Sequence, residues 1–191
     1  MQVINILDVL EYDGEENLKN RLATFSCPKN TEIDSFLKLN ALNFAKRKLS
    51  ITYLIFDEND GEILGYFTLA HKALEIKGDN MSNTARRRLS AHARLDVDSN
   101  SFTASAFLLA QIGKNYSIDK GKRITGNELI GFANDIMADI QHRIGGGIIY
   151  LDCEDKEHLK NFYIIQNHYK IFGERYSHTE NVRYLQMIRF F

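Results

Sequence analysis

Two rhythms of apolar residues alternate along the chain, and the first is helical. From Thr31 to Leu49, "TEIDSFLKLNALNFAKRKL" places apolar residues three or four positions apart, which is the spacing of one helix face. Asn30 or Thr31 is the expected N-cap, and acidic residues follow in the first turn. A shorter helix is expected over "EENLKNRLATF". The apolar positions of the longer helix are Ile33, Phe36, Leu37, Leu39, Ala41, Leu42, Phe44 and Ala45.

The second rhythm, which is typical of strands, begins at Ser50. Ser50–Asp57 and Glu62–Ile76 are rich in β-branched and aromatic residues, and the turn sequence "ENDG" separates them, so the two stretches predict a hairpin. A third strand is expected over Ser101–Asn115. Its nearly all-apolar run Ala106–Ile112 predicts a central strand covered on both faces. The polar segment Lys77–Asn100 is expected to be irregular, with a short helix near residues 82–89.

The last third of the chain returns to alternating helices and strands. "GKRITGNELIGFANDIMADI" (residues 121–140) begins as a loop and continues as a helix, which "GGG" at Gly145–Gly147 is expected to end. A strand over Ile148–Asp155 and a helix over Lys156–Asn167 follow, and "YKIFGE" and "RYLQMIRFF" read as closing strands. The order predicts a mixed α/β fold with a central strand–helix–strand crossover. A length of 191 residues fits one domain, residues 1–191.

Charge changes this picture in one place. A formal net charge of −1 argues against a general electrostatic grip on nucleic acid but leaves room for a local basic patch. The strongly basic stretch is "ARRRLSAHAR" (Ala85–Arg94). This stretch has two possible interpretations, a solvent-exposed helix face and a binding surface for an acidic partner.

The cysteines and the N-terminus bear on the compartment. Cys27 and Cys153 are far apart and match neither a disulfide framework nor a zinc-ligand spacing, so we expect two reduced thiols in a cytosolic protein. The N-terminal stretch lacks the basic region of a signal peptide. No apolar run approaches the roughly 20 residues of a membrane span. The expectation is a cytoplasmic protein without membrane association.

The loop before the helix at Gly126 carries candidate chemistry. A helix N-terminus presents unpaired N–H groups and a partial positive charge, and Lys120, Lys122 and Arg123 add full charges beside it. A phosphate site fits these features, and so does a solvated basic loop with a capping glycine. The sequence contains neither GxxxxGK[ST] nor GxGxxG, so the two best-known nucleotide motifs are absent.

Three stretches taken together resemble the GCN5-related N-acetyltransferases, the GNAT superfamily. "AFLLAQIGKNYS" with "KGKRITGNELI" resembles the central strand and pyrophosphate loop of that family. "IIYLDCEDKEHLKNFYIIQNHYKIFGE" resembles its next strand and the helix with its asparagine-and-tyrosine signature. The element order agrees over about residues 30 to 190. The family loop reads Gln/Arg-x-x-Gly-x-Gly/Ala, whereas this chain has Gly121, Ile124 and Gly126 at the three defined positions, so only the last one matches clearly.

The resemblance implies a fold and a cosubstrate. The fold is a GNAT-like mixed, mostly antiparallel central sheet flanked by helices, with a splayed central strand pair. Acetyl-CoA is the implied cosubstrate, and no metal is implied. Backbone groups of Gln111, Ile112 and Gly113 would pair with the pantetheine arm like an added strand. A β-bulge near Ala110–Ile112 would aim one N–H at the thioester carbonyl. The residues implied at the pyrophosphate are Lys122, Arg123, Ile124, Thr125, Gly126 and Asn127.

The same resemblance assigns roles in catalysis. Tyr163 occupies the position of the family's tyrosine and would be the general acid for the leaving thiolate, while a packed aromatic residue is the alternative. Asn161 would form a hydrogen bond to the coenzyme arm, and the alternative is a solvent-exposed side-chain amide on a helix. Glu154 is the candidate base, with Asp152 and His71 also open, and each has an ordinary structural role as its alternative. Cys153 lies within an apolar strand and is expected to be a buried thiol.

The implied function is an N-acetyltransferase. It would move the acetyl group of acetyl-CoA to a primary amine of an unidentified acceptor by direct attack in a ternary complex. The acceptor could be a small molecule, a protein or an aminoacyl-tRNA. The alternatives are a toxin-type enzyme acting on aminoacyl-tRNA and a non-catalytic module that binds CoA or a partner. The basic stretch would then grip an acidic acceptor or the coenzyme 3′-phosphate, and the apolar tail "MIRFF" could form the edge of a homodimer.

Overall fold

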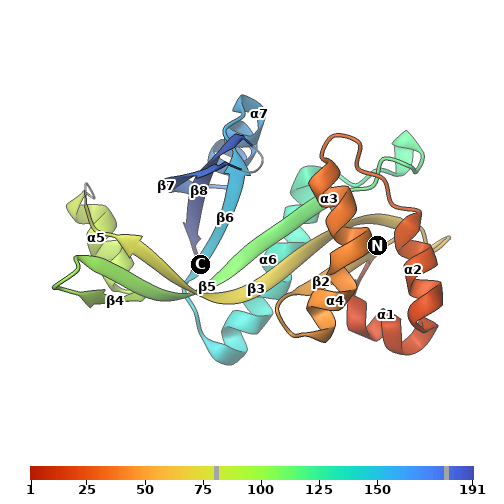
Figure 1. Ribbon diagram of the computed structural model, residues 1–191, viewed down its shortest axis with the longest axis horizontal. Helices are drawn as coiled ribbons and strands as arrows, with labels where there is room; N and C mark the ends of the chain where they lie inside the picture. The colour runs from red at the N-terminus through yellow and green to blue at the C-terminus, as the bar shows by residue number, and fades with distance from the viewer. Residues whose placement is uncertain (80–81, 179–180) are drawn as a thin grey trace. The chain divides into compact units, whose positions relative to one another are not determined.

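The computed structural model describes residues 1–79, 82–178 and 181–191, so positions 80 and 81 of the polar segment lie outside it (Figure 1). The chain divides into two compact units, and each unit combines two separate segments. The first unit contains Met1–Ala70 and Leu109–Ile136, and the second contains His71–Leu108 and Met137–Phe191. The expectation of a single domain stays a prediction.

The strands form one sheet in the order β1-β2-β3-β5-β6-β8-β7, with β4 paired to β5. Among the described residues, β5 and β6 pair in parallel, and the pairs β1–β2, β2–β3, β4–β5, β6–β8 and β7–β8 are antiparallel. The sheet is therefore mixed and mostly antiparallel, as expected. The strands are β1 (Gln2–Asn5), β2 (Ile51–Phe56), β3 (Ile63–Lys77), β4 (Ala93–Asp96), β5 (Ser101–Lys114), β6 (Ile148–Glu154), β7 (Lys170–Ser177) and β8 (Val182–Phe190).

Helices in the first unit supply its core. The long helix predicted from Thr31 is present, but it contains a π-helical turn. Its cap is Asn30, whose side chain accepts hydrogen bonds from the amides of Glu32 at 3.0 Å and Ile33 at 3.2 Å. The helical segments of this unit are α1 (Ile6–Asp13), α2 (Glu15–Ala23), α3 (Thr31–Ser35), the π-turn η1 (Phe36–Asn40), α4 (Ala41–Lys46), the 3₁₀ turn η2 (Lys120–Lys122) and the start of α6 (Gly126–Ile144).

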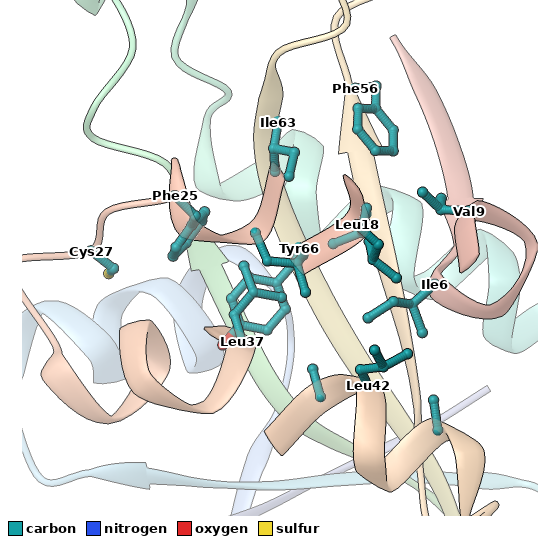
Figure 2. Packing of buried hydrophobic residues seen from close by; sticks show 14 residues of the cluster. Ile6, Val9, Leu18, Phe25, Cys27, Leu37, Leu42, Phe56, Ile63 and Tyr66 are labelled. Atoms are coloured by element: carbon teal, nitrogen blue, oxygen red, sulfur yellow. The ribbon is translucent and has the colours of Figure 1, made fainter. Parts of the chain in front are cut away.

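The core of the first unit gathers around Tyr66 on β3, which is fully buried (Figure 2). The Tyr66 hydroxyl donates to the carbonyl of Ile33 at 2.7 Å, and its ring meets Phe25 edge-on at 5.3 Å. The preceding residue, Gly65, has its Cα facing Ile124 and Leu129, because side chains alternate along a strand. The first turn of α6 therefore packs on one face of β3, and the α1–α4 helices pack on the other.

The second unit is built on β6. The antiparallel ladder of β6 with β8 covers the whole of β6, from Ile148 to Glu154. The parallel ladder of β5 with β6 covers three residue pairs and ends at Leu108 opposite Tyr150. The predicted splay of this strand pair stays a prediction. The helical segments of this unit are α5 (Asn83–Ser90), the end of α6, α7 (Glu157–Lys160) and the π-turn η3 (Asn161–Gln166).

The run Ala106–Ile112 lies on a central strand, as predicted, and its first four residues are buried or half-buried, but coverage of both faces does not continue past Leu109. Ala110 is exposed, and Gln111 and Ile112 are half-buried. An apolar side chain on a strand is not evidence of burial, because folded surfaces also contain many apolar atoms. The segment Lys77–Asn100 is also less irregular than expected, since it contains α5, which was predicted, and β4, which was not.

No helix among the described residues is long and apolar enough to cross a membrane.

Candidate functional site

The candidate coenzyme loop lies in the first unit, between the end of β5 and the start of α6, and a buried asparagine fixes its beginning. The Asn115 side-chain oxygen accepts from the amides of Ser26 and Ser117, each at 3.0 Å, and from the Ser117 hydroxyl at 2.8 Å. Its amide nitrogen donates to the carbonyl of Ile63 at 2.7 Å. Asn115 is 1% exposed. One side chain thus joins the loop to β3 and to the segment after α2.

Arg123 stabilises the loop from within. Its guanidinium donates to the carbonyl of Tyr116 at 2.7 Å and to that of Ile118 at 3.2 Å, and it lies over the Tyr116 ring at 5.2 Å. Lys29 approaches the same ring at 5.1 Å. The Arg123 side chain therefore binds backbone carbonyls of its own loop.

Lys122 ties the loop to the hairpin turn between β2 and β3. Its ammonium forms an ion pair with Asp60 and another with Glu62 at 3.3 Å. The hydrogen bond to Asp60 is the main reason that the pKa of Lys122 is raised, and it also lowers the pKa of Asp60. Two carboxylates thus already neutralise the charge of Lys122, which was expected to contact a phosphate.

A capping box closes the N-terminus of α6. The Glu128 carboxylate accepts from the Thr125 amide at 2.8 Å and from the Thr125 hydroxyl at 2.6 Å, while the Thr125 hydroxyl oxygen accepts from the Glu128 amide at 3.2 Å. These bonds, the one from the Thr125 hydroxyl foremost, lower the pKa of Glu128. A carboxylate thus occupies one amide of the predicted pyrophosphate site.

The other predicted loop residues divide between packing and the helix start. The Arg123 amide donates to the Lys120 carbonyl at 3.4 Å. Ile124 is buried, and its methyl group lies close to Gly65. Gly126 and Asn127 are the first two residues of α6. Their amides are therefore in the place where a helix N-terminus receives an anion.

The strand end predicted to meet the pantetheine arm is accessible at two of its three residues. Gln111 and Ile112 are half-buried, and the side-chain amide of Gln111 donates a hydrogen bond to the Glu32 carboxylate at 3.5 Å. Gly113 is buried. A Cβ added to Gly113 would lie 2.4 Å from the Ile33 Cγ2 atom and 3.3 Å from the Tyr66 ring. Glycine is needed at this position because α3 packs directly on the strand.

The candidate catalytic tyrosine lies in the second unit, on the π-turn η3 after β6 and α7. Tyr163 is 6% exposed, and its ring meets Tyr169 edge-on at 5.8 Å. The Tyr169 amide donates to the Tyr163 carbonyl at 3.0 Å. Burial is the main cause that raises the pKa of Tyr163 above its usual range. The phenol therefore keeps its proton at neutral pH, and the same burial makes it a weaker acid than an exposed phenol.

Tyr169 is a second buried phenol beside the first. It is 1% exposed, and its hydroxyl has no hydrogen-bond partner among the residues that the structure describes. Burial raises the pKa of Tyr169 to about 12. The two tyrosines are both buried and their rings are in contact, which makes Tyr169 a control for Tyr163.

The three candidate bases each have a partner in the second unit. Glu154 forms an ion pair with Lys156. Asp152 accepts from the Arg175 guanidinium at 2.9 Å, and the His71 ring nitrogen lies 2.9 Å from the Ser105 hydroxyl. Each of these contacts fits the ordinary structural role that is the alternative to a catalytic base.

The remaining candidates are Asn161 and Cys153. Asn161 is exposed on η3. Cys153 is buried with its sulfur 3.8 Å from that of Met187, and burial raises the pKa of its thiol to about 12. The expectation of a buried thiol is confirmed. Within the described residues, no group of three or more His, Cys, Asp and Glu side chains could hold a metal ion.

Sequence reasoning missed several residues that shape the loop. Thr125 and Glu128 could have been found, because Thr-x-x-Glu before an apolar helix is the capping-box pattern. Asn115 and Asp60 had no signal in the sequence, since the partners that tie them to other segments, Ile63 and Lys122, lie more than 50 residues away in the chain.

The fold is that of the GCN5-related N-acetyltransferases. Among solved structures of that fold, the chain is similar to AtaT complexed with acetyl-methionyl-tRNAfMet, at 12% identity and a TM-score of 0.63, over 96% of this chain and 92% of the other. It is also similar to a Tyr→Phe variant of KacT, at 16% identity and a TM-score of 0.64, over 97% and 94% of the two chains.

A third solved structure with this fold is AtaTR bound with acetyl-CoA, at 14% identity and a TM-score of 0.56, over 97% of this chain and 92% of the other. No protein-family model and no curated protein sequence matches the chain. Identities this low establish the shared fold only.

Proposed function

We propose that this protein is an N-acetyltransferase that moves the acetyl group of acetyl-CoA to a primary amine. The observation that carries the proposal is the shared fold over nearly the whole chain with AtaT and KacT, one of which has been solved with acetyl-CoA. The proposed acid, Tyr163, is a buried phenol that stays protonated at neutral pH. Coenzyme binding is assigned to the strand end Gln111–Gly113 and to the loop that leads into Gly126.

The chemistry is direct attack of a neutral amine on the thioester carbonyl. The new N–C bond forms as the C–S bond breaks, the departing thiolate takes the Tyr163 proton, and a base removes the proton from the attacking nitrogen. Holding the two reactants in line can contribute about 7–11 kcal/mol of the barrier reduction. Glu154 stays the proposed base, and its ion pair with Lys156 must open for that role.

A second candidate function is acetylation of the amino acid on an aminoacyl-tRNA. The observation that favours it is the similarity to AtaT complexed with acetyl-methionyl-tRNAfMet. An α-amino group has an ordinary pKa of about 7.7–8.0, so an appreciable fraction is neutral and nucleophilic near pH 7.

Calorimetric titration with acetyl-CoA, followed by a free-thiol assay over a panel of amines and aminoacyl-tRNAs, tests the proposal. We expect micromolar binding and thiol release with at least one acceptor. Binding without thiol release for any acceptor would instead support the non-catalytic module. Absence of binding would remove both enzyme functions.

Changing Glu128→Gln is expected to tighten acetyl-CoA binding by about three- to tenfold. The carboxylate occupies the Thr125 amide, so it competes with a pyrophosphate and repels it. Two unit charges about 4 Å apart interact by about 1 kcal/mol in water, which sets the size of the effect. Glutamine keeps an acceptor for the Thr125 amide, so α6 stays capped. The measurement is the calorimetric Kd.

S-acetyl-pantetheine is the control ligand, because it lacks the diphosphate. Its affinity should be the same for the wild-type protein and the Glu128→Gln variant. Equal tightening for both ligands, or no tightening for acetyl-CoA, contradicts a diphosphate at the start of α6.

A further inference from the structure

Helix α5 (Asn83–Ser90), in the second unit, exposes a basic surface that the proposed chemistry does not use. Between residues 82 and 95 the chain has four arginines and no acidic residue. Leu89 is buried in the core of this unit, whereas Arg87 and Arg88 are exposed. The helix thus has a buried apolar side and an exposed cationic side.

Two of the three α5 arginines, Arg86 and Arg88, are held in place without being neutralised. The Arg88 guanidinium lies 4.5 Å from the ring centre of Phe190, and that of Arg86 lies 5.3 Å from the ring centre of Phe102. Arg86 also donates to the Asn100 side chain. A cation stacked on a ring keeps its charge and its N–H donors, and less freedom is lost when it binds an anion.

Four arginines elsewhere among the described residues, which include Arg183, form ion pairs with acidic side chains. Arg21 pairs with Asp13 at 2.7 Å, Arg143 with Asp139 at 3.2 Å and Arg175 with Asp152 at 2.9 Å. No ion pair among the described residues involves Arg86, Arg87 or Arg88.

The acids that flank α5 in the chain are bonded to other groups. Asp79 accepts from the Asn100 side chain at 2.8 Å, and Asp96 accepts from the Asp98 amide at 3.0 Å. Among the described residues, neither carboxylate forms an ion pair with an α5 arginine, so the positive charge of these arginines is available to an external anion.

We infer that the exposed arginines of α5 dock the phosphate backbone of an RNA that carries the acceptor amine. The helix is about 12 Å long at 1.5 Å per residue, which exceeds the size of a single phosphate. A nucleic-acid duplex presents about one charge per 1.7 Å of its axis, so it matches a row of cations. RNA is favoured over DNA because aminoacyl-RNA carries an aliphatic amine that can be acetylated. The inference rests on the proposed function for its acceptor, but it concerns binding and not acetyl transfer.

The test measures binding of fluorescently labelled, deacylated tRNA by anisotropy over a series of salt concentrations. The double variant Arg87→Gln/Arg88→Gln should weaken binding about tenfold, and its slope of log K against log salt should be smaller by about 2. Acetyl-CoA affinity should be unchanged. Because this assay needs no acetyl transfer, it can fail while the acetyltransferase proposal stands, and the reverse is also possible.

The matched control is Arg47→Gln/Arg143→Gln, which also removes two positive charges, one from the exposed residue just after α4 and one from an exposed position on α6. It should leave tRNA affinity and slope unchanged. If the double α5 variant is unfolded by circular dichroism, Arg87→Gln alone should lower the slope by about 1. The inference is overturned if wild-type protein does not bind tRNA or if the control weakens binding as much as the α5 variant. Loss of acetyl-CoA affinity with tRNA binding intact also overturns it, since α5 would then bind the coenzyme 3′-phosphate.

Discussion

Replacing Tyr163→Phe is expected to lower kcat about 100-fold or more, while the Kd for acetyl-CoA stays within about twofold of wild type. General acid catalysis typically contributes 10²- to 10⁴-fold, and phenylalanine removes only the donor. Edge-on packing of the ring against Tyr169 is retained, so the variant should stay folded. The measurement is the single-turnover rate of thiol release together with a calorimetric titration.

Tyr169→Phe is the control for this substitution, because it removes a hydroxyl of similar burial from the neighbouring ring. Its kcat should match that of the wild type. Its thermal stability should be equal or higher, because the buried Tyr169 hydroxyl has no partner among the described residues. If Tyr163→Phe is as active as Tyr169→Phe, Tyr163 is a packing residue.

The pH profile gives an independent check on Tyr163. Burial raises the pKa of its phenol, so the protonated donor persists to a pH above the usual value of about 10. Deprotonation of Tyr163 should therefore not lower kcat between pH 7 and pH 10. Any change in rate over that range should instead follow the ionisation of the acceptor amine.

Replacing Asn115→Ala is expected to lower the free energy of unfolding by about 2–4 kcal/mol and to weaken acetyl-CoA binding. The substitution removes the partner of the Ser26 and Ser117 amides and of the Ile63 carbonyl, and unpaired buried groups cost about 1–3 kcal/mol each. Water can partly hydrate the less buried of these groups, so the expected loss of stability is smaller than the sum of the separate costs. The measurement is chemical denaturation together with calorimetric titration.

Asn59→Ala is the corresponding control, because the Asn59 side chain is exposed and bonds to Asp57 at 2.8 Å in the hairpin turn. Its stability should change by less than about 0.5 kcal/mol. A similarly small loss for Asn115→Ala would show that the loop keeps its shape without this side chain. Acetyl-CoA affinity that is unchanged in a destabilised Asn115→Ala protein would separate the loop from coenzyme binding.

Where the sequence carries a clear periodicity, it predicted the elements closely. The hairpin expected over Ser50–Asp57 and Glu62–Ile76 is found as β2 and β3, and α5 and the start of α6 lie within a residue or two of their expected places. The strands β1 and β4 were missed, because each has four residues and alternation over so short a stretch is not distinctive. β4 forms because β5 pairs with it along its length.

The candidate site was less predictable, because charge alone does not reveal a partner. Lys122 and Arg123 look alike in the sequence as free cations near a glycine loop. In the fold, Lys122 is neutralised by the hairpin turn, and Arg123 binds carbonyls of its own loop. Tyr163 was placed by resemblance to a family. The residue's burial could be guessed from its neighbours, but its π-helical turn could not, since no sequence rule distinguishes that turn from an ordinary helix.

The division of each unit into two segments has a consequence for how the protein is made on the ribosome. The first unit needs residues 109–136 as well as residues 1–70, and Asn115 cannot bond to Ser26 until that later segment has been synthesised. The helices near the N-terminus can pack on β2 and β3 before that, because Leu54 and Tyr66 of their buried cluster precede residue 70. The opposite face of β3, which packs against Ile124 and Leu129, stays uncovered while the intervening stretch 71–108, which belongs to the other unit, leaves the exit tunnel. Nascent chains that end before residues 109–136 therefore expose one apolar face of β3, so they are natural clients for chaperones that bind during translation.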